Sequence, residues 1–572
     1  MSAIEAETAA AAARPSALRS PTLWTGLAAV GWTAFLYDTE PDWFYFLPVA
    51  AVWAGLTAVI FAVTGRWRFA ALAAGLVFLA INAAARLKFA MVAMSLHVFD
   101  ALFHASLTQL EFFVHTFPKV AGAAAALIVG AIALLVAVWR REPRSGLGWR
   151  ARAGAALGVC LAAAPATLLF GAYNTDFFND RRHGLSSFLS SFRDLPDLWR
   201  NGALIETAGL PASPVAAPPL ACKPAGKAPH IILFLNESGL PPGVYPGLPF
   251  AEEAAAQFRS IDGTQRRLRV ETFGGATWLS DFSTLTGLST RDLGSMRNFA
   301  APFTTGRLAH ALPAYLKACG YDTTAIYPVP GEFGGTARFY RSIGFDRVVD
   351  QAIHKAPTDQ ERDAFYYDVA LGRLAEAKGS GRPQFISLAS MATHAPWDFR
   401  LAPEAVKRGE KLVWSGDRDY DEFMWRLVLG ARDRAAFKQA LAERFPGEPF
   451  LIVSYGDHQP ALKKIPLRDP TALAGDGRWA QLTPTSIAFE TYYQIDAVNF
   501  APRMPPQDIA ILDIPNLSTI LVDAARLPRD AWFDRRADLI ERCGGLYATC
   551  PDRQAVVEFQ TWLVAAGWLR AQ

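Results

Sequence analysis

Residues 230–238 read His230-Ile-Ile-Leu-Phe-Leu-Asn-Glu237-Ser238, a short apolar run that ends on a carboxylate. A second run, Phe450-Leu-Ile-Val-Ser-Tyr-Gly-Asp457-His458, ends in a similar way. Near-continuous apolar runs of this length are typical of strands that are buried on both faces of a parallel sheet. Ligands of such sheets gather at the carboxyl ends of the strands, so we expect Glu237, Asp457 and His458 to lie in one site.

The sequence around these two runs alternates strand-like and helical patterns from residue 229 to residue 572. Further strands are predicted at Arg267–Glu271, Thr323–Tyr327 and Gln384–Ala389. This alternation predicts an α/β domain with a central, mainly parallel sheet.

A third motif, Glu271-Thr-Phe-Gly-Gly-Ala-Thr277-Trp-Leu-Ser-Asp-Phe-Ser283, offers a nucleophile. Its two glycines would let backbone amides approach a phosphate, and the run Trp278–Thr286 predicts a helix whose N-terminus faces that anion. A threonine hydroxyl is a poor nucleophile near neutral pH, and a bound metal lowers its pKa. Carboxylate and imidazole ligands suit zinc or manganese. We therefore expect the strand-end ligands to hold one divalent ion, Zn or Mn, against the Thr277 oxygen, which would be a fourth ligand. The alternative is that Thr277 only caps a helix.

The N-terminal part is apolar enough to enter a membrane. The chain has 572 residues, of which 51% are hydrophobic, and it is too long for one ordinary domain. Its apolar residues concentrate before residue 175. The first and third predicted spans are short against the roughly 20 residues that a bilayer needs. The five predicted spans are Leu23–Tyr37, Trp43–Val63, Phe69–Ala84, Val120–Val138 and Ala153–Ala172.

Charge placement predicts the orientation. The loop 139–152 carries five arginines, whereas the loop Asp38–Asp42 has no positive charge. The positive-inside rule puts the N-terminal tail, residues 1–20, in the cytoplasm and everything after residue 172 outside. The net charge of +3 is too small to argue for a nucleic-acid partner.

Two further segments complete the expected organisation. Within the transmembrane domain, residues 21–172, the stretch 89–117 carries His97, His104 and His115, which one helix face could share. This helix would either line a lipid-headgroup path at the outer interface or simply pack as an amphipathic element. Residues 173–228 are predicted to be a juxtamembrane connector followed by a Pro/Ala-rich linker.

Cysteine usage agrees with an outside location. Cys543 and Cys550 would close a small loop, and we predict that disulfide. Cys222 with Cys319 is a second candidate pair, although sequence alone cannot fix the connectivity. Cys160 falls in the fifth predicted span, where it is expected to be a buried small hydrophobe. No CxxC pair occurs, which argues against zinc binding by cysteines.

The motifs resemble, in type and order, the membrane-bound phosphoglycerol and phosphoethanolamine transferases of the alkaline phosphatase/sulfatase superfamily. The resemblance is closest to lipoteichoic acid synthase and to the osmoregulated-glucan phosphoglycerol transferases. Members carry Glu-Ser after the first strand, a Gly-x-Thr turn, a Gly-(Phe/Tyr)-Asp segment and a late Asp-His pair. The matching residues are Glu237-Ser238, Gly275-Ala276-Thr277, Gly344-Phe345-Asp346 and Asp457-His458.

The resemblance implies transfer of a phospholipid headgroup at the outer face of a bacterial inner membrane. The expected donor is phosphatidylglycerol, the intermediate is phosphorylated Thr277, and the acceptor is a hydroxyl of a periplasmic glycan or glycolipid. A histidine of the family matches His394, which would assist the leaving group or the acceptor, unless it is a structural histidine. Ser390 stands where alkaline phosphatases have an aspartate, which favours a single metal ion.

The substrate pocket departs from the resemblance. Lipoteichoic acid synthases have a tryptophan and an arginine where this chain has Gly334 and Thr336. Arg338 lies two residues later and is a candidate phosphate contact, and Trp278 and Asn236 are further candidate substrate contacts.

Other activities remain as alternatives. Sulfatase activity is disfavoured, because Cys222-Lys-Pro-Ala-Gly226 lacks the arginine of the formylglycine motif and precedes the first strand. A phosphoethanolamine transferase acting on lipid A or another glycolipid is the nearest rival, followed by a membrane phosphodiesterase. A non-catalytic scaffold would be a different class of protein, and the retained metal-shell residues argue against it.

Overall fold

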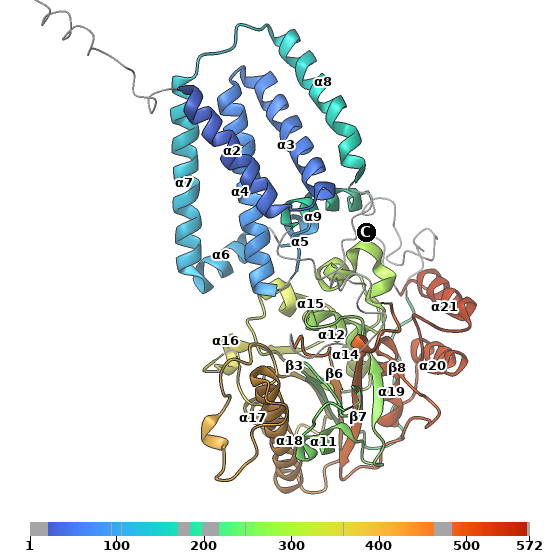
Figure 1. The fold of residues 1–572 in the computed structure, drawn as a ribbon. Helices are drawn as coiled ribbons and strands as arrows, with labels where there is room; N and C mark the ends of the chain where they lie inside the picture. The colour runs from blue at the N-terminus through green and yellow to red at the C-terminus, as the bar shows by residue number, and fades with distance from the viewer. Residues whose placement is uncertain are drawn as a thin grey trace, which may run out of the picture. The chain divides into compact units, whose positions relative to one another are not determined.

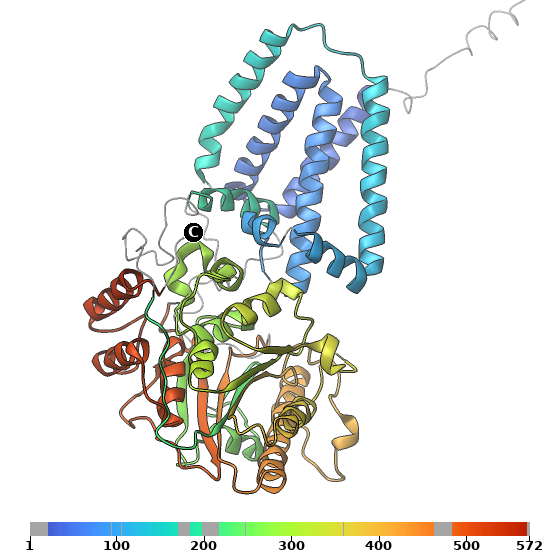
Figure 2. The same ribbon diagram turned by 180° about the vertical axis from the view of Figure 1, so that it is seen from behind.

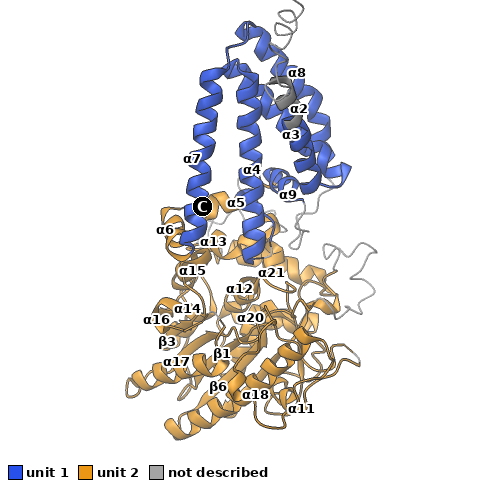
Figure 3. Cartoon of the chain, turned by 60° about the vertical axis from the view of Figure 1, so that its left-hand side comes forward, with its two compact units in different colours: residues 1–98, 117–193 blue, residues 99–116, 194–572 orange. Residues whose placement is uncertain are grey.

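The computed structural model describes residues 21–92, 94–104, 106–169, 183–196, 217–245, 247–358, 360–462 and 483–568, excluding the side chains of residues 21–27 and of Thr108. The chain forms two compact units, residues 1–98 with 117–193 and residues 99–116 with 194–572 (Figure 3). The predicted cytoplasmic tail and residues 197–216 of the predicted linker lie outside the described residues.

The first unit is helical, and five of its helices overlap the five predicted apolar segments (Figure 1). By length and composition, three of them could cross a membrane within the described part of the chain, namely α3, α4 and α7. The prediction of five spans is therefore not confirmed. The helices of this unit are α2 (Pro21–Thr39), α3 (Trp43–Thr64), α4 (Trp67–Val92), α7 (Pro118–Arg141), α8 (Trp149–Thr167) and α9 (Gly184–Ser190).

The segment between α4 and α7 is broken into two short helices, α5 (Val98–Phe103) and α6 (Leu107–Thr116). His97 precedes α5 and His104 follows it, so the prediction that three histidines share one helix face is wrong. A local cause is Ser106, whose Oγ accepts a hydrogen bond from the Gln109 amide at 3.2 Å and so favours a new helix start.

The second unit is built on one sheet of eight strands in the order β4-β3-β5-β1-β6-β7-β2-β8. The pairs from β4 to β6 and the β2–β8 pair are parallel, whereas β7 is antiparallel to both of its neighbours, so the predicted mainly parallel sheet is confirmed. The strands are β1 (His230–Asn236), β2 (Arg266–Arg269), β3 (Asp322–Ile326), β4 (Arg347–Val349), β5 (Gln384–Ala389), β6 (Phe450–Gly456), β7 (Glu490–Val498) and β8 (Leu512–Asp513).

Helices cover both faces of this sheet (Figures 1 and 2). On one face Ile232 and Ile452 pack against α17 and α18. On the other face the Tyr455 hydroxyl reaches Asp281 of α12. The helices of this unit, besides α5 and α6, are α11 (Glu252–Ala255), α12 (Thr277–Thr286), α13 (Ala300–Thr304), α14 (Leu312–Ala318), α15 (Thr336–Ser342), α16 (Gln351–His354), α17 (Asp363–Glu376), α18 (Arg418–Arg444), α19 (Leu517–Ala524), α20 (Ala531–Cys543) and α21 (Arg553–Ala565).

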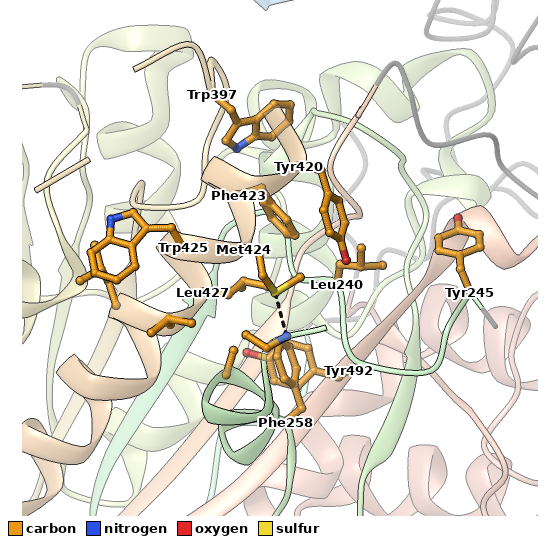
Figure 4. Packing of buried hydrophobic residues seen from close by; sticks show 14 of the residues in the cluster. Leu240, Tyr245, Phe258, Trp397, Tyr420, Phe423, Met424, Trp425, Leu427 and Tyr492 are labelled. Atoms are coloured by element: carbon orange, nitrogen blue, oxygen red, sulfur yellow. Dashed lines mark hydrogen bonds between the residues drawn. The ribbon is translucent and has the colours of Figure 1, made fainter. Parts of the chain in front are cut away.

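A second apolar cluster anchors the start of α18, as Figure 4 shows. Tyr420, Phe423 and Met424 are fully buried in it, and the Ala251 amide donates a hydrogen bond to the Met424 sulfur. Burying each side chain of this size contributes about 1.5–3 kcal/mol, so this end of α18 is firmly held.

Both predicted disulfides are present. Cys222–Cys319 joins the chain ahead of β1 to the turn ahead of β3, and Cys543–Cys550 closes the end of α20. Cys160 in α8 is half-buried rather than fully buried.

Candidate active site

Strand register brings the predicted metal ligands together. β1 and β6 are adjacent parallel strands, with Asn236 level with Gly456. Their next residues, Glu237 and Asp457, therefore emerge side by side at the carboxyl edge of the sheet. His458 follows directly, so the sheet itself delivers three possible ligands to one point.

Two glycines allow this close approach. A Cβ on Gly239 would lie 2.7 Å from the Cα of Gly456, and a Cβ on Gly456 would lie 3.0 Å from the Cα of Gly239. Any side chain at Gly239 would push the turn after β1 away from the end of β6. The turn itself contains Ser238 with a positive φ of 53°, so the backbone bends sharply directly after Glu237.

The side chains form a tight cluster. Possible ligand atoms of Glu237, Asp457 and His458 all lie within 4.8 Å of one another. His458 Nε2 is 3.3 Å from Glu237 Oε1 and 3.2 Å from Asp457 Oδ2. The Thr277 hydroxyl donates to Glu237 Oε2 at 3.0 Å and lies 3.4 Å from His458 Nε2. The structure thus brings all four predicted residues into one contact network.

Thr277 is presented by the start of α12. Ala276 adopts a left-handed conformation, with φ of 63°, and Thr277 is the first helical residue after it. The Thr277 side chain points to the carboxylate cluster instead of capping the helix. Free amides and the positive end of the helix dipole therefore lie where the hydroxyl is displayed, an arrangement that suits a phosphate.

Neighbouring groups fix the ligands. Asp457 Oδ1 accepts from the amides of Ser238 and His458, each at 2.8 Å. The Ser238 hydroxyl donates to Glu237 Oε1 at 3.0 Å. His458 Nδ1 lies 2.9 Å from the Gln459 carbonyl, which accepts the Nδ1 proton and leaves Nε2 facing the cluster.

The cluster fits one divalent cation. The three ligands are between 0% and 3% exposed, and Asp457 Oδ2 is buried without a hydrogen-bond partner. Burial raises the pKa of Asp457 to about 7, and the nearby Glu237 carboxylate adds to this. Burial lowers the pKa of His458, but the two carboxylates outweigh it and raise that pKa overall. These shifts reflect the cost of burying two carboxylates side by side, which a bound cation would offset.

His394 lies beside the cluster on the loop that follows β5. It is half-buried, and its Nδ1 contacts the Ala395 carbonyl. Burial would raise the pKa of Glu237, but the charges of His458 and His394 hold it below the ordinary value. His394 is therefore close enough to act electrostatically at the site.

The candidate substrate residues have different surroundings. Trp278 is half-buried next to Thr277, and its Nε1 donates to the Asn298 carbonyl at 3.4 Å. Asn236 is buried and donates to the Tyr492 hydroxyl at 2.7 Å, so it supports the end of β1.

Arg338 is exposed on α15. Tyr340, two residues later, points to α12, and positions two apart lie on roughly opposite sides of a helix. The structure does not bring Arg338 to the cluster, and we leave it out of the proposed site.

Sequence reasoning missed the residues that brace the nucleophile helix. Asp281, one turn after Thr277, is buried and accepts from the Tyr340 hydroxyl at 2.6 Å and from the Tyr455 hydroxyl at 3.4 Å. Burial raises the pKa of Asp281 to about 6, although both hydroxyls oppose this. The sequence signal for Asp281 was its i, i+4 spacing from Thr277, which places both residues on one face of a helix.

One family model matches part of the chain. Residues 264–520 match the family model described as Sulfatase, a range that contains Thr277, His394, Asp457 and His458 but not Glu237. The chain is 24% identical to an uncharacterized protein of Haemophilus influenzae over 41% of its own length and 44% of that protein. It is 29% identical to the capsular polysaccharide biosynthesis protein RkpI of Rhizobium meliloti over 34% of its length and 35% of that protein. The chain thus spans less than half the length of these curated relatives.

Two transferases are among the solved structures to which the chain is similar. One is a Streptococcus pyogenes phosphoglycerol transferase, GacH, in complex with sn-glycerol-1-phosphate, with 17% identity and a TM-score of 0.45 over 60% of this chain and 85% of that chain. The other is the integral membrane lipooligosaccharide phosphoethanolamine transferase A of Neisseria meningitidis, with 10% identity and a TM-score of 0.45 over 87% of this chain and 95% of that chain.

Proposed function

Because the chain carries a domain of the sulfatase family, we propose that it is a metal-dependent transferase of phospholipid headgroups. The proposed donor is phosphatidylglycerol, and the acceptor is a hydroxyl of a periplasmic glycan or glycolipid. The spans would place the catalytic domain outside a bacterial inner membrane, with the N-terminus in the cytoplasm, where a lipid donor is within reach.

The observation that supports this most directly is the position of the Thr277 hydroxyl. It lies 3.0 Å from Glu237 Oε2 and 3.4 Å from His458 Nε2, at the start of a ten-residue helix. A hydroxyl held against a metal-type ligand set and an anion-binding helix end is suited to attack a phosphodiester.

Transfer would then take two steps. In the first, the Thr277 oxygen bonds to phosphorus and the bond to diacylglycerol breaks. The hydroxyl proton leaves toward Glu237, which already accepts its hydrogen bond, and His394 protonates the departing oxygen. In the second, His394 takes the acceptor hydroxyl proton, the acceptor oxygen bonds to phosphorus, the bond from phosphorus to the Thr277 oxygen breaks, and that oxygen takes its proton back from Glu237. One zinc or manganese ion, when bound, would lower the pKa of the hydroxyl and stabilise charge on the phosphoryl oxygens.

The test is the intact mass of the purified full chain after incubation with phosphatidylglycerol, phosphatidylethanolamine and a divalent metal. We expect a phosphoglycerol adduct that maps to Thr277 and is absent in Thr277→Ala. Thr305→Ala is the matched control, since Thr305 is a half-buried threonine at the end of α13. A phosphoethanolamine adduct would instead favour the rival transferase. Diacylglycerol release with water as the only acceptor would favour a phosphodiesterase, and no adduct with no release would refute the proposal.

A further inference from the structure

A buried guanidinium holds the loop that carries His394, together with the Gln360 side-chain amide, which donates to the His394 and Ala395 carbonyls at 2.8 Å each. Arg426 of α18 is completely buried. Its Nη1 donates to the carbonyls of Ala392 and His394, at 3.3 and 2.8 Å. Its Nη2 donates to the carbonyls of Pro396 and Phe399, at 3.0 and 3.2 Å. One side chain therefore fixes four carbonyls within eight residues of chain.

Glu422, one turn earlier on α18, completes this support. Its Oε1 accepts from Arg426 Nε at 2.9 Å and from the Leu401 amide at 2.7 Å. Its Oε2 lies 3.2 Å from Arg400 Nε. The opposite charges of Glu422 and Arg426 thus balance each other, and the pair contacts the loop from Ala392 to Leu401.

The same loop is tied directly to the proposed metal site. The Thr393 hydroxyl donates to the Glu237 carbonyl, and Trp397 Nε1 donates to the Thr393 carbonyl at 3.0 Å. Trp397 packs edge-on against Phe423 of α18, with ring centroids 6.0 Å apart (Figure 4). The backbone of His394 is therefore placed between a metal-ligand strand and a rigid helix.

We propose that Arg426 is a positioning residue, whose guanidinium sets the His394 imidazole against the reacting phosphoryl group. This inference rests on the role given to His394 in the proposed function. A buried ion pair is not a strong source of stability, because desolvation offsets its attraction. The planar fork of arginine matches four converging carbonyls, and lysine, a single charged point, cannot replace it. Precise placement matters here, because a displacement of about 1 Å in a catalytic group can lower the rate about 100-fold.

The first experiment is a double-mutant cycle on adduct turnover, with Arg426→Gln and His394→Ala alone and together. We expect Arg426→Gln to reduce turnover by about 100-fold alone and to have no further effect in the His394→Ala protein, because it acts through that histidine. Arg426→Lys should not restore activity. Arg432→Gln is the matched control, since Arg432 lies on the same helix but pairs with Glu253 at the surface.

A structural readout separates positioning from general damage. Diethylpyrocarbonate should modify His394 at a different rate in Arg426→Gln, whereas His230 on β1 should react as in the wild type. Zinc content should stay unchanged, because the three ligands leave other strand ends. Guanidinium ion, added below its unfolding range, should restore part of the activity of Arg426→Ala.

The proposal and the proposed function fail in different ways. An unchanged labelling rate at His394 would overturn the positioning role. So would a loss of activity from Arg426→Gln that is as large in the His394→Ala protein as in the wild type. Loss of metal together with activity would also overturn it, since the effect would then lie in the fold. Absence of any Thr277 adduct in the wild type, with altered His394 labelling in Arg426→Gln, would refute the proposed transfer while leaving the positioning of His394 established.

Discussion

Removing the Cys222–Cys319 disulfide should destabilise the catalytic unit far more than removing Cys543–Cys550. Cys222 lies ahead of β1, the strand that ends in Glu237, and Cys319 lies just ahead of β3. The bond therefore closes a long loop that contains β1, β2 and the first proposed metal ligand. The second disulfide closes only a short loop at the end of α20.

The magnitudes follow from loop length. The two bridges span 97 and 7 residues. The chain-entropy relation gives a stabilisation of about 4.7 kcal/mol for the long loop and about 2.4 kcal/mol for the short one at 25 °C. The double serine variant of the long bridge should therefore show about twice the decrease in Tm of the corresponding variant of the short bridge.

Thermal unfolding in one detergent, followed by tryptophan fluorescence, would measure this difference. Cys160→Ser is the control, because Cys160 is the free cysteine among the described residues. Equal decreases for the two bridges, or a larger decrease for the short one, would refute the loop-entropy reasoning. Strain relieved from the native fold, and not the constraint on the unfolded chain, would then set the stability.

Three further predictions concern single side chains. Burial, and then the charge of Asp433, raises the pKa of Asp363 to about 7. This folded-state pKa lies above the pKa of Asp363 in the unfolded chain. Below about pH 4 Asp363 is protonated in both states and does not lower the stability. As the pH rises toward 7, Asp363 ionises first in the unfolded chain, so the free energy of unfolding falls. Asp363→Asn should therefore gain Tm over the wild type at pH 8 and not at pH 4, and a pH-independent difference would contradict this. Phe299 is 3% exposed, and its ring centroid lies 5.7 Å from that of Phe103 in α5. Phe299→Ala should therefore cost about 3–5 kcal/mol and speed hydrogen exchange in α5 but not in β6. Unchanged exchange in α5 would contradict this packing role. Arg338→Ala should leave the KM for the lipid donor unchanged, because Arg338 is exposed on the far side of α15, and a clear rise in KM would return it to the site.

The sequence predicted the parts of the fold that periodicity controls. β1 and β5 begin and end at the predicted residues, His230–Asn236 and Gln384–Ala389, since each is largely apolar and mostly buried. β7 was missed because Glu490–Val498 mixes polar and apolar residues and pairs in the antiparallel sense. Strand order and orientation depend on long-range pairing, which local pattern does not encode.

The candidate site divides in the same way. Glu237, Asp457 and His458 could be placed together because parallel strands share one carboxyl edge. Arg426 could not be found, because a buried arginine inside a long helix looks like a surface residue until its loop partners are known. Arg338 was predicted to contact the phosphate because it lies close in sequence to the expected substrate residues. The direction of its side chain on α15 decides which groups it can contact, and sequence distance does not give that direction.

Thr277, the proposed nucleophile, is held by contacts that need no metal. The Ser280 hydroxyl donates to the Asp457 carbonyl at 2.5 Å, and Asp281 ties the next turn of α12 to Tyr340. Thr277 therefore reaches Glu237 through the fold itself, and little conformational entropy would remain to be lost when a substrate binds. A buried carboxylate pair is costly without a counter-charge, so this order is maintained against an electrostatic penalty. Such a penalty is expected for a site whose geometry is set before its cation binds. The arrangement of Glu237, Asp457 and His458 therefore serves the proposed chemistry at a cost in stability.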